Sequence, residues 1–120
     1  MGGIFVARAR NVFRIPKRRE EELTDILKES GFRVVWREGA DEIVPRRVPV
    51  NYPRIDSWKT NPPVPVAYIY PAYADISKRV TLQINQNYSG FPREIEHIKS
   101  ELAPYQARVR AIVEDFLHQR

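Results

Sequence analysis

Arginine is the residue whose type and spacing most clearly suggest a chemistry in this sequence. The chain has 15 arginines against 5 lysines, and a guanidinium group is a permanently charged planar fork that fits phosphate and carboxylate groups. Residues 1–19 carry six positive charges and no negative one, and residues 43–60 carry four against one, whereas residues 20–42 carry three against eight. The basic character is therefore local, which favours an anionic partner. The arginine bias also follows from a GC-rich genome or a hot habitat, and then needs no partner.

Alternation along the chain places several of these arginines on one side of predicted strands. In residues 4–15 the odd-numbered apolar residues alternate with arginines, and residues 32–37 and 79–87 alternate in the same way. Residues 66–70 form a further β-rich run. If helices cover the apolar face of the sheet, the opposite face collects Arg8, Arg10, Arg14, Arg33, Arg37, Arg79, Thr81, Gln83 and Asn85, together with Tyr68 and Tyr70.

Such a face has the composition of a single-strand nucleic-acid binder. Arginines contact phosphates, aromatic rings stack on unpaired bases at about 1–3 kcal/mol per base, and amides hydrogen-bond base edges. One alternative is a face that only meets water, as one face of an antiparallel or mixed sheet ordinarily does. Another is that Tyr68 and Tyr70 point into the core. We expect binding of single-stranded DNA or RNA with weak sequence preference.

Residues 39–65 lack periodicity, and we predict that they form one long Pro-rich loop between the second and third strands. Its six prolines oppose a helix or a central strand. The loop carries a second basic and aromatic cluster, in which we assign Arg46 and Arg47 to nucleic-acid binding. Its apolar residues either anchor it to the surface of its own chain or dock a protein partner.

The segment 92–118 is predicted to be the longest helix. Pro104 lies inside it and removes one backbone hydrogen bond, so we expect a kink or break near Leu102. Apolar residues recur at steps of three and four, which is the a/d pattern of a helix that pairs with another helix. We therefore expect a homo-oligomer whose interface consists of Ile95, Ile98, Leu102, Tyr105, Val109, Ile112 and Phe116.

The sequence shows no set of residues with the spacing of a catalytic site. It has no cysteine, and Glu94, His97 and Glu101 give only half of a carboxylate-bridged di-metal arrangement. We therefore expect no catalytic residues, no metal and no cofactor, and an enzyme ranks last among the classes of function, after a nucleic-acid-binding protein and an adaptor. Since no apolar run is long enough to span a bilayer, we expect a cytoplasmic protein that does not contact membranes.

Together these patterns predict a single α+β domain over residues 1–120. We expect a four-stranded mixed sheet with two helical segments on one face, in the order β-α-β-β-β-α. The first two strands and the helix between them have the pattern of a right-handed crossover with parallel strands.

Overall fold

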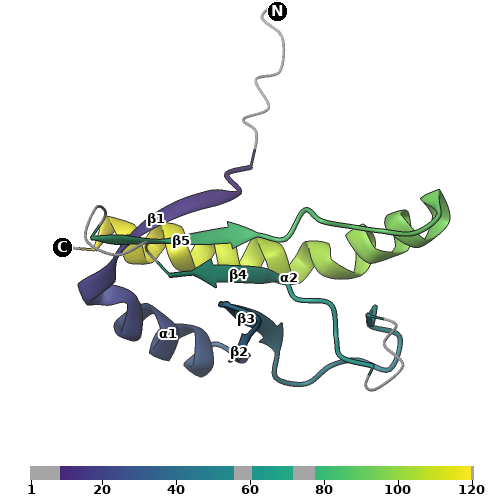
Figure 1. Cartoon of the computed structure of the whole chain (residues 1–120), viewed down its shortest axis with the longest axis horizontal. Coiled ribbons are helices and arrows are strands. Elements are labelled where there is room, and N and C mark those ends of the chain that lie inside the picture. The colour runs from purple at the N-terminus through teal and green to yellow at the C-terminus, as the bar shows by residue number, and fades with distance from the viewer. Residues whose placement is uncertain (1–8, 56–60, 72–77, 120) are drawn as a thin grey trace, which may run out of the picture.

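The computed structural model describes residues 9–55, 61–71 and 78–119, which form an α+β fold of one sheet and two helices. Figure 1 shows α2 running along the sheet, with α1 beside it. In chain order the elements are β1 (Val12–Pro16), the short 3-10 helix η1 (Lys17–Arg19), α1 (Glu20–Glu29), β2 (Phe32–Arg37), β3 (Ala40–Pro45), β4 (Ala67–Tyr70), β5 (Arg79–Ile84) and α2 (Pro92–His118).

The sheet has five strands in the order β1-β5-β4-β3-β2, and all neighbouring strands are antiparallel. The predictions of four strands and of a mixed sheet are therefore wrong. The segment from β1 through α1 to β2 does return in the original direction, but β1 and β2 lie at opposite edges of the sheet. Three antiparallel strands fill the space between them, so the expected parallel pair does not form.

The strand missing from the prediction is β3, which forms a hairpin with β2. The two residues of the turn, Glu38 and Gly39, both have positive φ, at 52° and 87°. This is the backbone of a two-residue hairpin turn that suits the twist of the flanking strands. Pro45 is the last residue of β3, where it does not interrupt the ladder. The irregular loop therefore begins after Pro45 and not at Gly39.

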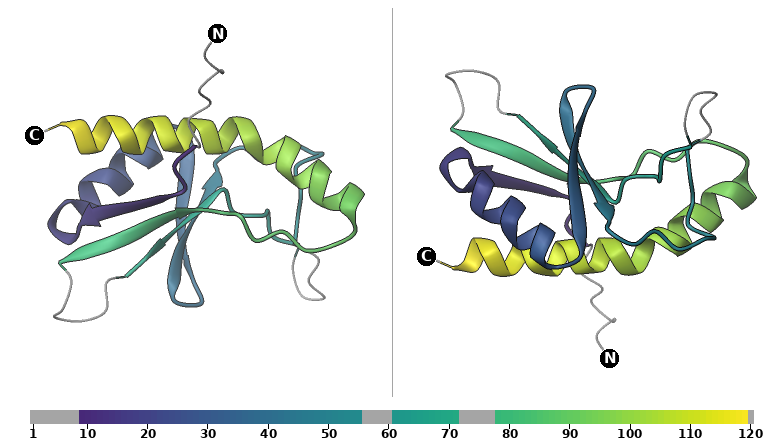
Figure 2. Two further views of the ribbon diagram at one scale, coloured as in Figure 1. Left: turned by 90° about the horizontal axis from the view of Figure 1, so that it is seen from above. Right: turned by 90° about the horizontal axis from the view of Figure 1, so that it is seen from below.

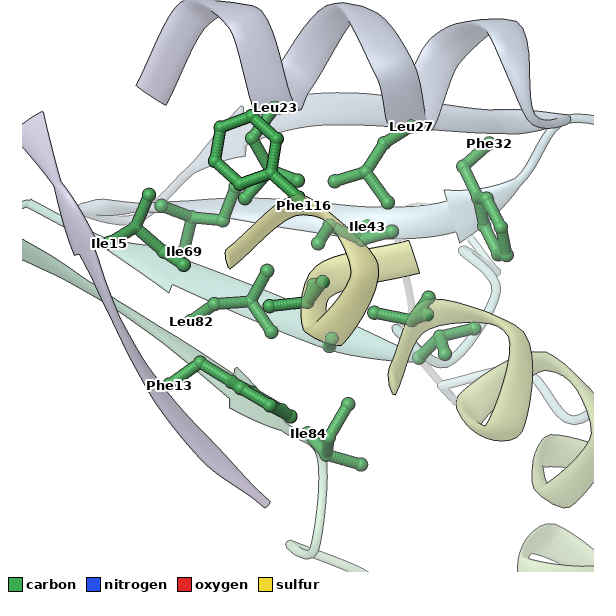
Figure 3. Close-up of a cluster of buried hydrophobic side chains, with 14 of the residues drawn as sticks. Phe13, Ile15, Leu23, Leu27, Phe32, Ile43, Ile69, Leu82, Ile84 and Phe116 are labelled. Atoms are coloured by element: carbon green, nitrogen blue, oxygen red, sulfur yellow. The ribbon is translucent and has the colours of Figure 1, made fainter. Parts of the chain in front are cut away.

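Both helices pack on the same face of the sheet, as predicted (Figure 2). Leu23 and Leu27 from α1 and Phe116 from α2 meet the inward residues of the strands in one continuous core, part of which is drawn in Figure 3. The inward strand residues include Phe13, Ile15, Phe32, Ile43, Ala67, Ile69, Val80, Leu82 and Ile84, all of them buried.

α2 is one continuous helix with Pro104 inside it, so the alternative of a break is not observed. Its amino-terminal part turns away from the axis of the remainder (Figure 2), as a proline inside a helix leads one to expect. The buried positions are Leu102, Gln106, Val109, Val113 and Phe116.

The predicted oligomer seam is thus largely used within the chain. Leu102, Val109 and Phe116 are fully buried in its own core, and Ile98, Tyr105 and Ile112 are partly buried against that core. Ile95 is also only partly exposed. Packing on the sheet accounts for this stripe, and oligomerisation through α2 stays a prediction. Within the described part of the chain, no helix is apolar enough over a sufficient length to cross a membrane.

The described residues between β3 and β4, 46–55 and 61–66, are held to the domain by backbone and side-chain contacts. Residues 53–55 and 62–64 pair through the backbone, with Ile55 N donating to Pro62 O at 2.8 Å and Val64 N to Pro53 O at 3.0 Å. The buried Tyr52 hydroxyl donates to Val64 O at 2.7 Å, and its ring meets Tyr105 of α2 edge to face. Much of the predicted loop is therefore an ordered arm that packs on α2.

The facing of β5 can be tested by shortening Leu82, which is completely buried. Leu82→Ala should lower the free energy of unfolding by about 2–5 kcal/mol, because a cavity forms in a packed core. Urea denaturation gives this value. The matched control is Gln83→Ala, next in the strand and facing the other way, which should change it by less than about 0.5 kcal/mol. A loss below about 1 kcal/mol for Leu82→Ala would contradict the packing.

Candidate functional site

The sheet face opposite the helices, here called the open face, carries most of the residues singled out from the sequence. Its membership follows from the strand register, because side chains alternate between the two faces. Phe13 and Leu82 are paired and point to the core, so the next pair, Arg14 and Thr81, points away from it. The open face comprises Val12, Arg14, Arg33, Val35, Arg37, Ala40, Glu42, Val44, Tyr68, Tyr70, Arg79, Thr81 and Gln83.

Two tyrosines occupy the central strand of the open face. Tyr68 and Tyr70 of β4 have ring centroids 5.8 Å apart and ring planes inclined by 30°. Tyr70 is 37% exposed, whereas Tyr68 is half-buried between Gln83 of β5 and Glu42 of β3. Burial raises the pKa of the Tyr68 hydroxyl to about 12, with further contributions from Glu42 and Tyr70. The two rings form a neutral aromatic step in the middle of the sheet.

Arginines flank these rings towards both edges of the sheet. Arg14 and Arg79 lie on β1 and β5, and Arg33 and Arg37 lie on β2, all of them exposed. Arg14 donates to the Thr81 hydroxyl at 2.9 Å. Thr81 of β5 is paired with Tyr70 of β4, so this bond holds the Arg14 guanidinium on the side of the sheet next to Tyr70. The two edge strands are four spacings of about 4.8 Å apart, or about 19 Å.

One acid on the open face was missed in the sequence because β3 was not recognised. The Glu42 carboxylate lies 3.5 Å from the Arg37 guanidinium, and its side chain is 13% exposed. Burial raises its pKa; Arg37 acts in the opposite direction, and Glu38 raises the pKa further. The open face therefore carries four positive charges and one negative charge.

Two predicted binding residues lie elsewhere, and a third, Arg8, lies outside the described residues. The Arg10 guanidinium sits 4.7 Å from the ring centre of Phe13, whose side chain belongs to the helix-covered face. Arg46 donates to the Lys28 carbonyl at the carboxyl end of α1. Neither guanidinium therefore lies on the open face, because β1 begins only at Val12 and the segment after β3 returns to α1; a role of Arg10 and Arg46 in binding stays a prediction.

The two remaining predictions have different outcomes. Arg47 is exposed and stays a candidate from the segment that follows β3. Asn85, predicted to lie on the binding face, is only 2% exposed. Its amide donates to Pro65 O at 2.9 Å and its side-chain oxygen accepts from Asn87 N at 2.9 Å. Asn85 is therefore a structural residue that fixes the end of β5.

The described segments contain no group of three His, Asp or Glu side chains placed to hold a metal ion. Comparison of the chain with models of protein families, with curated proteins and with solved structures finds no match. The site must therefore be interpreted from its own geometry, which combines an aromatic centre, cationic edges and a single carboxylate.

The raised pKa of Glu42 has a defined consequence for stability. Because the folded-state pKa exceeds the unfolded value, ionisation of Glu42 disfavours the fold, and this penalty appears as pH rises from the unfolded pKa through the folded pKa. Glu42→Gln should therefore raise the urea midpoint at pH 7, and the gain should shrink as pH falls towards about 4, near the ordinary pKa of glutamate. The control Glu96→Gln, at an exposed position on α2, should leave the urea midpoint unchanged both at pH 7 and at the acidic pH. A gain that grew on acidification would contradict the shift.

Proposed function

We propose that this protein binds single-stranded nucleic acid through the open face, with weak sequence preference. The observation that carries the proposal is the position of Tyr68 and Tyr70 on the central strand, between arginines on both sides. Every base has a flat face that can stack on an aromatic ring, and every phosphate attracts a guanidinium. A strand of nucleic acid lying across the sheet meets these groups in the order phosphate, base, phosphate.

The dimensions of the open face fit a short segment. Its span of about 19 Å between edge strands corresponds to about six stacked nucleotides at about 3.4 Å each. The Gln83 amide and the Thr81 hydroxyl lie beside the tyrosines, where they can hydrogen-bond a base edge. Glu42 is the one group here that repels phosphate, and Arg37 partly neutralises it.

The alternative is an adaptor that oligomerises through α2 and docks a protein partner with the Pro-rich loop. Its α2 surface is largely occupied by packing on the sheet. In the loop, Tyr52 and Val64 are buried against the chain's own core, although Val50 is fully exposed. These contacts support nucleic-acid binding over the adaptor function, because much of the apolar surface that an adaptor would use is packed within the chain, whereas the arginines of the open face are exposed.

Salt dependence tests the arginines directly. If four arginines contact phosphates, the logarithm of the association constant for a six-residue oligothymidylate should fall with log salt at a slope near −3, at about 0.7 per contact. Fluorescence anisotropy from about 50 to 200 mM salt measures it. The variant Arg14→Glu/Arg79→Glu should bind all oligonucleotide sequences more weakly, and its slope should be shallower by about 1.4.

The matched control is Arg18→Glu/Lys17→Glu, two exposed cations of η1 that are absent from the open face. It reverses the same amount of charge and should leave the slope unchanged. If the wild-type protein binds no oligonucleotide more tightly than about 0.1 mM at about 50 mM salt, the open face is only a solvated surface and the adaptor function replaces this proposal.

A second test separates stacking from charge. Tyr70→Ala should weaken oligonucleotide binding by about 1–3 kcal/mol, because the ring that stacks on a base is lost. Tyr70→Phe keeps the ring and should bind like the wild type. Titration by anisotropy at one salt concentration distinguishes the two. Equal losses in both variants would assign the effect to the hydroxyl and not to stacking.

A further inference from the structure

We propose that a groove at one end of the open face continues the nucleic-acid path and binds the nucleotides beyond those on the sheet. This inference rests on the proposed function. The groove has a volume of about 780 Å³ and lies between the paired arm 53–55/62–64, the segment after β5 and the first turns of α2. Figure 2 shows these three segments together at the end of the molecule where the amino-terminal part of α2 extends past the sheet.

The groove and the open face share Tyr68. This side chain lies on the open face by its register with Glu42 and Gln83, and it also lines the groove. β4 begins and β5 ends at this point, so the groove starts where the sheet stops. A strand that stacks on Tyr68 is therefore already in contact with the lining of the groove.

The lining of the groove combines side chains that can contact the phosphate, the base and the sugar of a nucleotide. Arg54 comes from the arm and Arg93 from α2, so each wall supplies one exposed guanidinium for a phosphate. Ile55, Val64 and Ile98 supply apolar surface for a base. Hydrogen-bonding side chains that can reach a base or sugar are Asn87, Ser89 and His97.

The charge balance favours an anionic strand over a neutral or basic peptide. Two arginines and one acid, Glu94, line the groove. The Glu94 carboxylate lies against Gly90, where an added Cβ would collide with it, and the arginines outnumber the acids in the groove by two to one. The cation-rich walls also continue the excess of arginine on the open face.

The floor of the groove is fixed before any ligand arrives. Asn85 donates to Pro65 O at 2.9 Å, and the Tyr88 hydroxyl donates to Asn85 O at 2.8 Å. Gln106 of α2 donates to the same Asn85 oxygen at 2.8 Å. These buried bonds join the arm, the segment after β5 and α2, so the groove does not have to be assembled on binding.

The experiment compares fluorescein-labelled oligothymidylates of six and twelve nucleotides, the first sufficient for the open face and the second long enough to reach the groove. The groove variant is Arg54→Glu/Arg93→Glu. The control is Arg18→Glu/Lys99→Glu, which reverses the same charge at exposed positions outside the open face and the groove lining. Each oligonucleotide is compared between the two variants, because a longer one also offers more binding registers.

Relative to the control, the groove variant should bind the six-nucleotide probe within about twofold and the twelve-nucleotide probe at least tenfold more weakly. Its salt slope for the longer probe should be shallower by about 1.4, the contribution of two phosphate contacts. In the wild-type protein, amide resonances of Ser89, Gly90 and Arg93 should shift with the longer probe and not with the shorter one.

Two results would overturn the inference, and they differ in what they say of the open face. If the groove variant and the control bind the longer probe with equal affinity and equal slope, the groove is not part of the path and its occupant is of another class, such as a peptide. Binding of the six-nucleotide probe would then still support the proposed function of the open face. If the wild type binds neither probe, the proposed function and this inference both fail.

Discussion

The buried side-chain amide of Gln106 is the interaction on which both surfaces of the molecule depend. Its nitrogen donates to Asn85 O at 2.8 Å and to the Tyr88 hydroxyl at 3.2 Å, and it lies 3.4 Å from Val66 O. Val66 and Asn85 lie where β4 begins and β5 ends, beyond the last pairs of the ladder. Val66 O also accepts from Asn85 N at 3.0 Å, so Asn85 O is the carbonyl that depends on side-chain donors, namely Gln106 and the Tyr88 hydroxyl. A buried carbonyl left without a partner costs about 1–3 kcal/mol. The amide therefore fixes the rotation of α2 on the sheet and the position of the arm that follows β3.

Fixing α2 on one face determines the chemistry of the other. Side chains in a strand alternate with a period of two, so burying Ala67, Ile69 and Leu82 under the helices forces Tyr68, Tyr70 and Thr81 outward. The same rule carries Arg14 and Arg79 outward at one edge and Arg33 and Arg37 at the other. The open face is thus a consequence of core packing on a one-sided sheet.

The sequence allowed this facing to be predicted, since alternation is visible in residues 32–37 and 79–84 without knowledge of strand order. It did not allow β3 to be predicted, because Asp41, Glu42 and Pro45 make a poor strand by composition. The turn Glu38-Gly39 was the available signal, and its glycine could have indicated a hairpin. Because β3 was not predicted, neither the strand order of the sheet nor the position of Glu42 on the open face could be predicted.

The buried residues of α2 also differ in part from those predicted, because their environment depends on other parts of the chain. The sequence pattern selects Tyr105 and Ile112, whereas the helix buries Gln106 and Val113 one position later. A polar residue is not expected in a core, and only the backbone carbonyls that end the strands make it favourable there. No pattern local to α2 contains that information. The groove could not be predicted for the same reason, because its lining comes from the arm, the segment after β5 and the first turns of α2.

Charge is distributed unevenly between the helical layer and the open face of the sheet. The exposed acids Glu21, Glu22, Asp25 and Glu29 lie on α1, on the helix-covered side of the sheet. The opposite side carries four arginines and one partly neutralised carboxylate. The net charge of +5 therefore understates the asymmetry, because most of the acid is held behind the sheet. An approaching polyanion is repelled by α1 and attracted by the arginines of the open face, so long-range forces turn it towards the surface that carries Tyr68 and Tyr70.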